Sequence, residues 1–257
     1  MKAIAELTAD EARGARYVAT DIDDTFTHGG RFTERALGAL TRLEGAGIDV
    51  LVVTGRSAGF ALALATYLPG VVGAVAENGG VVIRDGAPEL AEGVRGSPQA
   101  LRARFRRCHA EIVRRVPAAR ETPNTFTRLT DFCMYLDGLT DDDHAFIRGR
   151  AEAHGLRVAR SSIRLHLYEG EYDKASALRA WLARAEGSAD PATVVTVGDS
   201  ANDAAILDAR AWPLSVGVRN VEKYLGQMPG EPAYITRAPE AEGFVELVDT
   251  LLARRGD

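Results

Sequence analysis

Residues 17 to 25 read Tyr17-Val18-Ala19-Thr20-Asp21-Ile22-Asp23-Asp24-Thr25, a short apolar run that leads directly into three acidic residues. This pattern is typical of a buried strand that delivers carboxylates to its carboxyl end. Open α/β sheets bind their ligands at that edge. Aspartate also favours turns, so the stretch taken alone fits an acidic turn after an ordinary strand equally well. The rest of the chain has to distinguish the two interpretations.

The composition is that of an ordinary globular protein. The 257 residues are enough for one large domain or two smaller ones, and 46% are hydrophobic and 26% charged, with a mean hydropathy of −0.11. The net charge of −5 gives no basic footprint for nucleic acid. An anionic ligand would therefore need local positive charge from a few side chains or a metal ion.

Targeting and redox signals are weak. The first residues, 1 to 6, reach an acid too early for a signal peptide, and no apolar run approaches the length of a membrane span. Cys108 and Cys133 show no CxxC spacing, so we expect two core thiols in a reducing compartment. We expect a cytoplasmic protein that binds neither nucleic acid nor membranes; its oligomeric state is not predicted.

The first third of the chain alternates strands and helices. Apolar runs at 48–53 and 71–76 predict strands, and helical periodicity predicts helices at 33–46 and 57–68. Strands that are apolar almost throughout, each followed by a helix, indicate a parallel, doubly wound sheet of the Rossmann-like α/β class.

The pattern changes at about residue 85. We expect helices at 98–116 and 140–154, one or two strands within 126–136, and strands at 156–160 and 163–168. The arginine-rich face of the first helix suits solvent better than nucleic acid in an acidic protein. These elements predict a compact α+β insert over residues 85–172.

The α/β alternation then returns. We expect helices at 174–185, 202–209 and 239–254, and strands at 193–197, 213–218 and 234–236. The sequence thus predicts a core formed by residues 1–84 and 173–257, interrupted by the insert.

Polar side chains follow three of the predicted core strands. Asp21 and Asp199 end two different strands, and two carboxylates with water and phosphate oxygens suit Mg²⁺. Thr54 and Lys174 could hold phosphate oxygens. The spacing of Asp21 and Asp23 brings both side chains near one point, one as nucleophile and the other as proton donor.

Four segments resemble the ordered motifs of the haloacid dehalogenase superfamily of phosphotransferases. They are residues 21–25 (DIDDT), 53–56 (VTGR), 173–174 (DK) and 198–203 (GDSAND). The insert is similar to the type II cap of that superfamily, and within it to subgroup B. A single DxD is a weak signal, whereas four motifs in order at strand ends and a helix start are specific.

The resemblance implies an enzyme that hydrolyses phosphomonoesters. Asp21 would attack phosphorus and form an aspartyl-phosphate, and Asp23 would protonate the leaving group and later deprotonate water. Mg²⁺ would be held by Asp21, the Asp23 carbonyl and Asp199. The phosphoryl group would be bound by Thr54, Gly55 and Lys174, while Asn202 and Asp203 would orient the metal shell and the lysine.

Many relatives have glycine at the positions of Asp24 and Ala175. Neither side chain is needed for the chemistry, so these departures bear on the identity of the substrate more than on the presence of activity. Possible substrate contacts are Arg56, Asn78, Arg164 and His166. Each also has a structural alternative: Arg56 could cap its own loop, Asn78 could belong to a plain turn, and the last two could lie on an outward polar face. The insert would set specificity.

The sequence predicts a Mg²⁺-dependent phosphatase for a small phosphorylated metabolite. A sugar or glycerate phosphate is favoured, because residues 235–239 and 242–244 resemble mannosyl-3-phosphoglycerate and sucrose-phosphate phosphatases. Two alternatives are a sugar phosphomutase and a catalytically silent binding or regulatory protein on the same fold.

Overall fold

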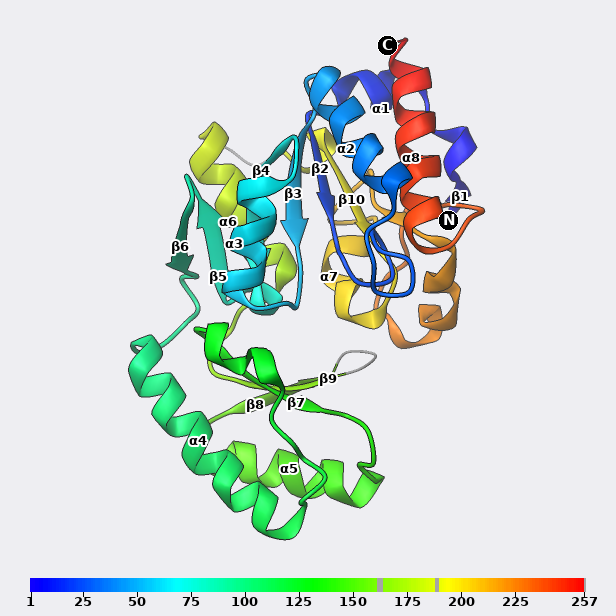
Figure 1. Cartoon of the computed structure of the whole chain (residues 1–257). Coiled ribbons are helices and arrows are strands. Elements are labelled where there is room, and N and C mark those ends of the chain that lie inside the picture. The colour runs from blue at the N-terminus through cyan, green and yellow to red at the C-terminus, as the bar shows by residue number, and fades with distance from the viewer. Residues whose placement is uncertain (161–163, 188–189, 257) are drawn as a thin grey trace.

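The computed structural model describes residues 1–160, 164–187 and 190–256. It contains one nine-stranded sheet and a separate three-stranded sheet (Figure 1). The large sheet has the strand order β1-β12-β11-β10-β2-β3-β4-β5-β6. Its mostly parallel strands, flanked by helices, confirm the predicted α/β fold class.

The organising stretch forms the centre of the large sheet. β2 (Tyr17–Thr20) pairs in parallel with β10 (Val194–Gly198) on one side and β3 (Asp49–Val53) on the other, and β3 pairs with β4 (Val71–Ala76). Thr20 lies opposite both Val197 and Val52. The carboxyl ends of these strands therefore meet at one edge of the sheet, which is where the motif residues begin.

Shorter strands complete the sheet at both sides. β11 (Val216–Gly217), β12 (Tyr234–Ile235) and β1 (Lys2–Ala3) extend it in parallel beyond β10. The hairpin of β5 (Val81–Arg84) and β6 (Ala87–Leu90) forms the opposite edge. β6 thus pairs with the large sheet although its residues fall in the predicted insert. The strand predicted at 213–218 is reduced to two residues.

Side-chain alternation along the central strands builds two cores. Val18 and Val50 point to one face and Ala19 and Leu51 to the other. The first face is covered by α1 (Ala9–Gly14), α2 (Glu34–Gly45), α3 (Ala58–Tyr67) and α8 (Glu240–Arg255). The second is covered by α6 (Lys174–Glu186) and the short α7 (Ala204–Leu207). Both faces are buried, which explains why these strands are apolar throughout.

The insert has its own sheet and core. β7 (Asp131–Tyr135), β9 (Arg164–Tyr168) and β8 (Arg157–Arg160) are antiparallel, in the order β7-β9-β8. α4 (Pro98–Arg115) and α5 (Asp141–Ala153) pack on one face of this sheet. The other face is turned toward the carboxyl ends of the large sheet (Figure 1). Ile163, predicted to begin β9, lies outside the described residues.

Alternation in the small sheet separates its apolar and polar faces. Phe132 and Leu167 belong to the core shared with α4 and α5. Asp131 and His166 lie on the opposite face, yet both are buried. This second face is therefore covered by the core of the protein and does not face solvent.

The two connections between the large sheet and the insert touch each other. The Glu171 amide donates a hydrogen bond to the Gly93 carbonyl at 3.4 Å. Gly170 approaches the same carbonyl so closely that a Cβ there would lie 2.2 Å from its oxygen. The chain thus leaves for the insert and returns from it at one place.

Single turns of 3-10 helix link several elements: η1 (Ile4–Glu6), η2 (Glu77–Gly79), η3 (Pro123–Thr127), η4 (Pro191–Thr193), η5 (Ala201–Asp203), η6 (Arg219–Lys223) and η7 (Leu225–Gln227). The strand predicted within 126–136 is β7, which is preceded by η3, and the helix predicted at 202–209 is formed by η5 and α7. No described helix is long and apolar enough to span a membrane.

Candidate active site

Asp21 directly follows β2 and is paired with a buried lysine. Lys174, the first residue of α6, donates through Nζ to Asp21 Oδ1 and to Asp203 Oδ1, each at 2.6 Å. Both acids and the lysine are almost completely buried. Burial pulls the pKa of Lys174 down, but the two carboxylates outweigh it and hold the pKa above its ordinary value. Lys174 is therefore a fixed positive charge beside Asp21.

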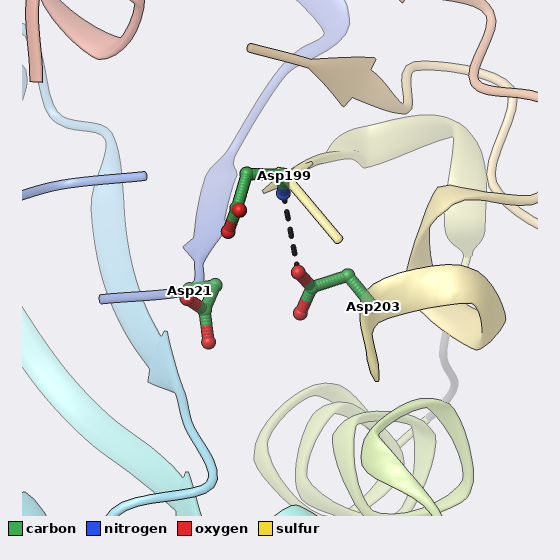
Figure 2. A group of neighbouring side chains, drawn as sticks. All are labelled: Asp21, Asp199 and Asp203. Carbon is green, nitrogen blue, oxygen red and sulfur yellow. Dashed lines mark hydrogen bonds between the residues drawn. The ribbon is translucent and has the colours of Figure 1, made fainter. Parts of the chain in front are cut away.

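Asp203 uses both of its oxygens within the protein. Oδ1 accepts from Lys174, while Oδ2 accepts from the amides of Asp199 and Ser200 at 3.1 and 3.2 Å and from the Ser200 hydroxyl at 3.2 Å. Figure 2 shows the first of these amide contacts. Asp203 thus positions both the lysine and the loop after β10.

Asp199 follows β10 and faces Asp21 across the edge of the sheet (Figure 2). Its Oδ1 accepts from the Thr25 hydroxyl at 2.9 Å and its Oδ2 from the Asn220 side chain at 3.1 Å. Asn220 also donates to the Asp24 carbonyl at 2.9 Å. The carboxylate is therefore held in one orientation by two neutral donors. No local sequence pattern marks Asn220, which lies in η6 after β11.

The cluster contains more negative than positive charge. Oxygens of Asp21, Asp199 and Asp203 lie within 4.8 Å of one another, and Lys174 is the ammonium group bonded to two of them. Burial, assisted by the neighbouring carboxylates, raises the pKa values of Asp21 and Asp199 well above 3.8. Oδ2 of Asp21 accepts no hydrogen bond from the described residues. Such a cluster is stabilised by a further proton or a cation, so this group could hold a metal ion.

Asp23 lies at the mouth of the site and is only half-buried. Arg56 donates two hydrogen bonds to its carboxylate, from Nε to Oδ2 at 2.7 Å and from Nη2 to Oδ1 at 2.5 Å. The hydrogen bonds to Asp23 raise the pKa of Arg56 above its ordinary value. The alternative that Arg56 caps its own loop does not hold for this side chain, because both donors go to Asp23.

Asp24 adopts a left-handed backbone, with φ of 59°. Its carbonyl accepts from Asn220, while its side chain takes no part in the cluster. Glycine reaches this conformation without strain, and aspartate is one of the few other residues that tolerate it.

The loop after β3 presents a buried hydroxyl and a close backbone. Thr54 is buried, and its Oγ1 accepts from the Arg56 amide at 3.1 Å. The Asn78 side chain packs directly against Gly55, and its Oδ1 is buried without a partner among the described residues. Asn78 therefore lies behind this loop and is absent from the lining of the cavity at Asp21.

Glu77, at the end of β4, connects the core to the insert. Its carboxylate accepts from the amide of Ala58 in the core and from the amides of Leu129, Thr130 and Asp131 in the insert, at 2.7 to 3.2 Å. The Thr130 hydroxyl adds a bond of 2.7 Å. Burial and the nearby Asp131 raise the pKa of this carboxyl above its usual range. The segment 77–80 is thus more than the plain turn that its sequence suggests.

A small cavity lies between the two sheets, with a volume of about 60 Å³. Its core wall includes Asp21, Asp23 and Asp199, together with Gly55, Arg56 and Asn202. Its opposite wall comes from the insert: Asn124, Arg128, Arg164 and His166. Arg164 and His166, which the sequence singles out, therefore face this cavity. Arg128 and Asn124 were missed, because nothing in their local sequence marks them.

Comparison with known proteins places the chain among the haloacid dehalogenase-like hydrolases. A model of that family matches residues 18–92. The phosphoglycolate phosphatase of Pyrobaculum neutrophilum is 30% identical over 246 residues, covering 93% of this chain and 97% of that protein. The phosphoglycolate phosphatase of Methanothermobacter thermautotrophicus is 28% identical over 234 residues, covering 91% and 97%.

Solved structures share the fold at low sequence identity. A protein of Thermoplasma acidophilum aligns with a TM-score of 0.71 and 19% identity, covering 92% of this chain and 98% of that one. A haloacid dehalogenase-like hydrolase of Bacteroides thetaiotaomicron aligns with a TM-score of 0.67 and 18% identity, covering 91% and 98%. The fold, the motifs and these matches together show that the chain belongs to the haloacid dehalogenase-like hydrolase family. Within that family it is a phosphatase.

Proposed function

We propose that the protein is a Mg²⁺-dependent phosphomonoester hydrolase that works through an aspartyl-phosphate on Asp21. The observation that carries this proposal is the placement of Asp21, which lines the cavity: Lys174 holds its Oδ1 at 2.6 Å, while its Oδ2 accepts no hydrogen bond from the described residues. A carboxylate fixed at one oxygen and open at the other suits in-line attack on phosphorus.

In the first half-reaction, an Asp21 oxygen forms a bond to phosphorus as the bond to the ester oxygen breaks. Asp23, at the mouth of the same cavity, gives its proton to the departing alkoxide. Lys174, and the backbone at Thr54 and Gly55, bind oxygens of the transferring phosphoryl group. These groups stay fixed during the reaction, which is what phosphoryl transfer requires most.

In the second half-reaction, Asp23 takes a proton from water and the resulting nucleophile attacks phosphorus. The bond to Asp21 breaks, its carboxylate is restored and inorganic phosphate leaves. Arg56 keeps the Asp23 carboxylate in one orientation for this step, in which Asp23 acts as the base, through its two hydrogen bonds.

The donor set fits Mg²⁺. Asp21, the Asp23 carbonyl and Asp199 would hold the ion, and the unbalanced negative charge of the buried cluster supports a cation there. Bound Mg²⁺ neutralises charge on the phosphoryl oxygens and on the attacking carboxylate. Asp203 is fully occupied by Lys174 and the loop after β10, so it would position these groups and stay outside the coordination shell, with Asn202 beside it.

The substrate is a small phosphorylated metabolite. A cavity of about 60 Å³ holds the equivalent of roughly five water molecules, which favours a short acid or sugar phosphate over a hexose phosphate. The relatives named phosphoglycolate phosphatases match nearly the whole chain, which puts phosphoglycolate first on the panel to be tested.

The test is phosphate release by the purified protein with MgCl₂. The panel contains phosphoglycolate, 3-phosphoglycerate, glycerol 3-phosphate and hexose phosphates. We expect hydrolysis of at least one short member, and a loss of at least about 1,000-fold in kcat for Asp21→Asn. Asp24→Asn is the matched control and should retain activity, because asparagine tolerates the positive φ. No hydrolysis of any member would favour a silent binding protein, and transfer to a second hydroxyl would indicate a mutase.

A further inference from the structure

The two walls of the cavity differ in charge. Three acids line it, and all three belong to the core. Of the three lining arginines, Arg56 comes from the core and is paired with Asp23, and the other two come from the insert: Arg128, which is paired with Asp131, and Arg164. The wall facing the proposed phosphoryl site is therefore cationic and rich in hydrogen-bond donors, and no acid from the insert lines the cavity within the described residues.

Arg128 is the most constrained of these groups. It precedes β7, and its side chain is only 2% exposed. Nη1 donates to both oxygens of Asp131 at 2.7 and 2.8 Å and to the Gly55 carbonyl at 3.1 Å. The last contact joins the guanidinium to the loop that carries Thr54 and Arg56. Arg128 is thereby fixed relative to the phosphoryl site.

Asp131 orients a second group on the same wall. Its Oδ2 contacts His166 Nδ1 at 2.7 Å, and Asp131 itself is buried. Because a carboxylate accepts, Nδ1 carries the proton in this contact. The imidazole is thus held in a defined orientation with its ring at the cavity wall.

Arg128 retains donors that the protein does not use. A guanidinium has five N–H donors and no acceptor. Within the described ranges all of the hydrogen bonds of the Arg128 side chain leave from Nη1, no described residue accepts from Nη2, and Nε is buried without a partner. A buried charged group that is held rigidly and left with free donors on a cavity is arranged to receive an acceptor.

We propose that Arg128, positioned by Asp131, binds a carboxylate of the substrate, assisted by Arg164 and His166. This inference rests on the proposed phosphatase function and narrows it to phosphate esters of short hydroxy acids. The Nη2 group of Arg128 can donate a charge-assisted hydrogen bond to a carboxylate oxygen, whereas a sugar hydroxyl brings no negative charge to the guanidinium.

The size of the cavity limits the distance between the two anionic groups. The phosphoryl site at Asp21 and the guanidinium of Arg128 line the same space of about 60 Å³. A short substrate, with its carboxylate one or two carbons from the ester oxygen, fits a space of this size. Phosphoglycolate has this layout, and 3-phosphoglycerate is one carbon longer.

The experiment compares phosphoglycolate with 2-hydroxyethyl phosphate, which replaces the carboxylate by a neutral hydroxymethyl group. For the natural chain with Mg²⁺, we expect kcat/KM to be about 10- to 100-fold higher for phosphoglycolate, the size of a lost charge-assisted hydrogen bond. Arg128→Gln should remove most of that ratio by raising KM for phosphoglycolate, with a smaller effect on the neutral ester. Arg150→Gln, which alters a partly exposed arginine of the insert, should keep the ratio.

Two further arms keep the test decisive. The double variant Arg128→Gln/Asp131→Asn avoids leaving a buried aspartate unpaired. It should also lose the preference in kcat/KM for phosphoglycolate, and thermal unfolding should show that it is still folded. Binding of the two esters to Mg²⁺-loaded Asp21→Asn, measured by calorimetry, reports the same preference without turnover. Equal kcat/KM and equal affinity for the two esters would overturn the carboxylate site while leaving the phosphatase proposal intact. If the natural chain bound phosphoglycolate preferentially but hydrolysed neither ester, the phosphatase proposal would be overturned and the carboxylate site would stand.

Discussion

Arg56 and Asp23 form a two-pronged ion pair at the mouth of the cavity, with Nε to Oδ2 at 2.7 Å and Nη2 to Oδ1 at 2.5 Å. The two residues are 33 positions apart in the sequence and follow different strands, β3 and β2. The proposed acid–base group is thus oriented by the neighbouring loop, which we propose binds phosphate. The two hydrogen bonds join the two motifs directly.

Replacing Arg56 by glutamine should therefore reduce kcat by about 10- to 100-fold, because Asp23 loses the partner that orients it. The measurement is steady-state phosphate release. In an Arg56→Gln/Asp23→Asn variant the two losses should be far from additive, since both residues serve one step. Arg42→Gln, which breaks a surface pair with Asp249, is the control and should change little. Additive losses would show that Arg56 acts independently of Asp23.

Lys174 should be essential for both stability and turnover. Methionine at this position keeps most of the volume but leaves Asp21 and Asp203 buried without their cation, which costs about 3–5 kcal/mol in the free energy of unfolding. Urea unfolding of the metal-free protein measures this loss. The exposed Lys223 offers a matched control, and Lys223→Met should stay within about 0.5 kcal/mol. A stable Lys174→Met protein would mean that the acids are not ionised together in the native state.

The stability of the metal-free protein should fall as pH rises from about 5 to 8. Burial raises the pKa of Asp21 to about 8 and that of Asp199 to about 9, above the unfolded value near 3.8. In this window the native state binds more protons than the unfolded state. Each group therefore lowers the free energy of unfolding by up to about 1.4 kcal/mol for each pH unit. Thermal unfolding with EDTA measures the slope.

Two comparisons test the origin of that slope. Asp199→Asn should flatten it, and adding MgCl₂ to the unaltered chain should stabilise more at pH 8 than at pH 6, because the ion competes with the extra protons. Carboxyl groups whose pKa is lowered in the folded protein, such as Asp131, change the free energy of unfolding only below about pH 4. They do not contribute to the slope between pH 5 and 8. A slope unaffected by Asp199→Asn would locate the titration elsewhere.

Glu77 should hold the insert against the core. Glu77→Gln exchanges one acceptor oxygen for a donor facing backbone amides, which we expect to cost at least about 2 kcal/mol. Hydrogen exchange at the amides of residues 129–131 should accelerate more than exchange in β2 or β10. Glu89→Gln removes an exposed carboxylate paired with Arg184 and serves as the control. Uniform acceleration across the protein would indicate general destabilisation and not release of the insert.

Gly79 should tolerate no side chain. Its φ is 108°, and a Cβ there would lie 2.2 Å from the carbonyl oxygen of Asp173, the residue before Lys174. Gly79→Ala should displace the start of α6, lowering both stability and turnover substantially. Gly86→Ala is matched in backbone conformation, with φ of 72° and no atom within 4 Å, and should cost only about 1 kcal/mol. Comparable effects of the two substitutions would contradict a specific role for this contact.

Local sequence patterns predict the core well because each element is specified by its own residues. The strand expected at 71–76 is β4, and the helix expected from residue 174 is α6. The patterns fail where a residue is buried without belonging to a strand, or is apolar and yet exposed. Leu214 and Ser215 are buried outside any strand, which explains the overlong prediction at 213–218, and Phe126 is 74% exposed in η3.

Motif residues could be located in advance because each lies at the end of a predictable element. The partners that give them their chemistry could not. Asn220 reaches Asp199, and Glu77 reaches Thr130 53 positions away. Arg128 is one arginine among many in its region of the chain. Its special status comes from burial against Asp131 and Gly55, which only the packed structure determines.

The contact between Gly93 and Gly170 has a consequence for how such proteins diversify. The chain leaves the large sheet and returns to it at one point. The geometry of the large sheet therefore does not depend on the size of the insert. An insert of another size would therefore leave the pairing of β2 with β10 and β3 unchanged, although the contacts of Arg128 with Gly55 and of Glu77 with residues 129–131 would have to be replaced. The proposed chemistry at Asp21 and the proposed selection of substrate by the insert thus lie on separate segments of the chain.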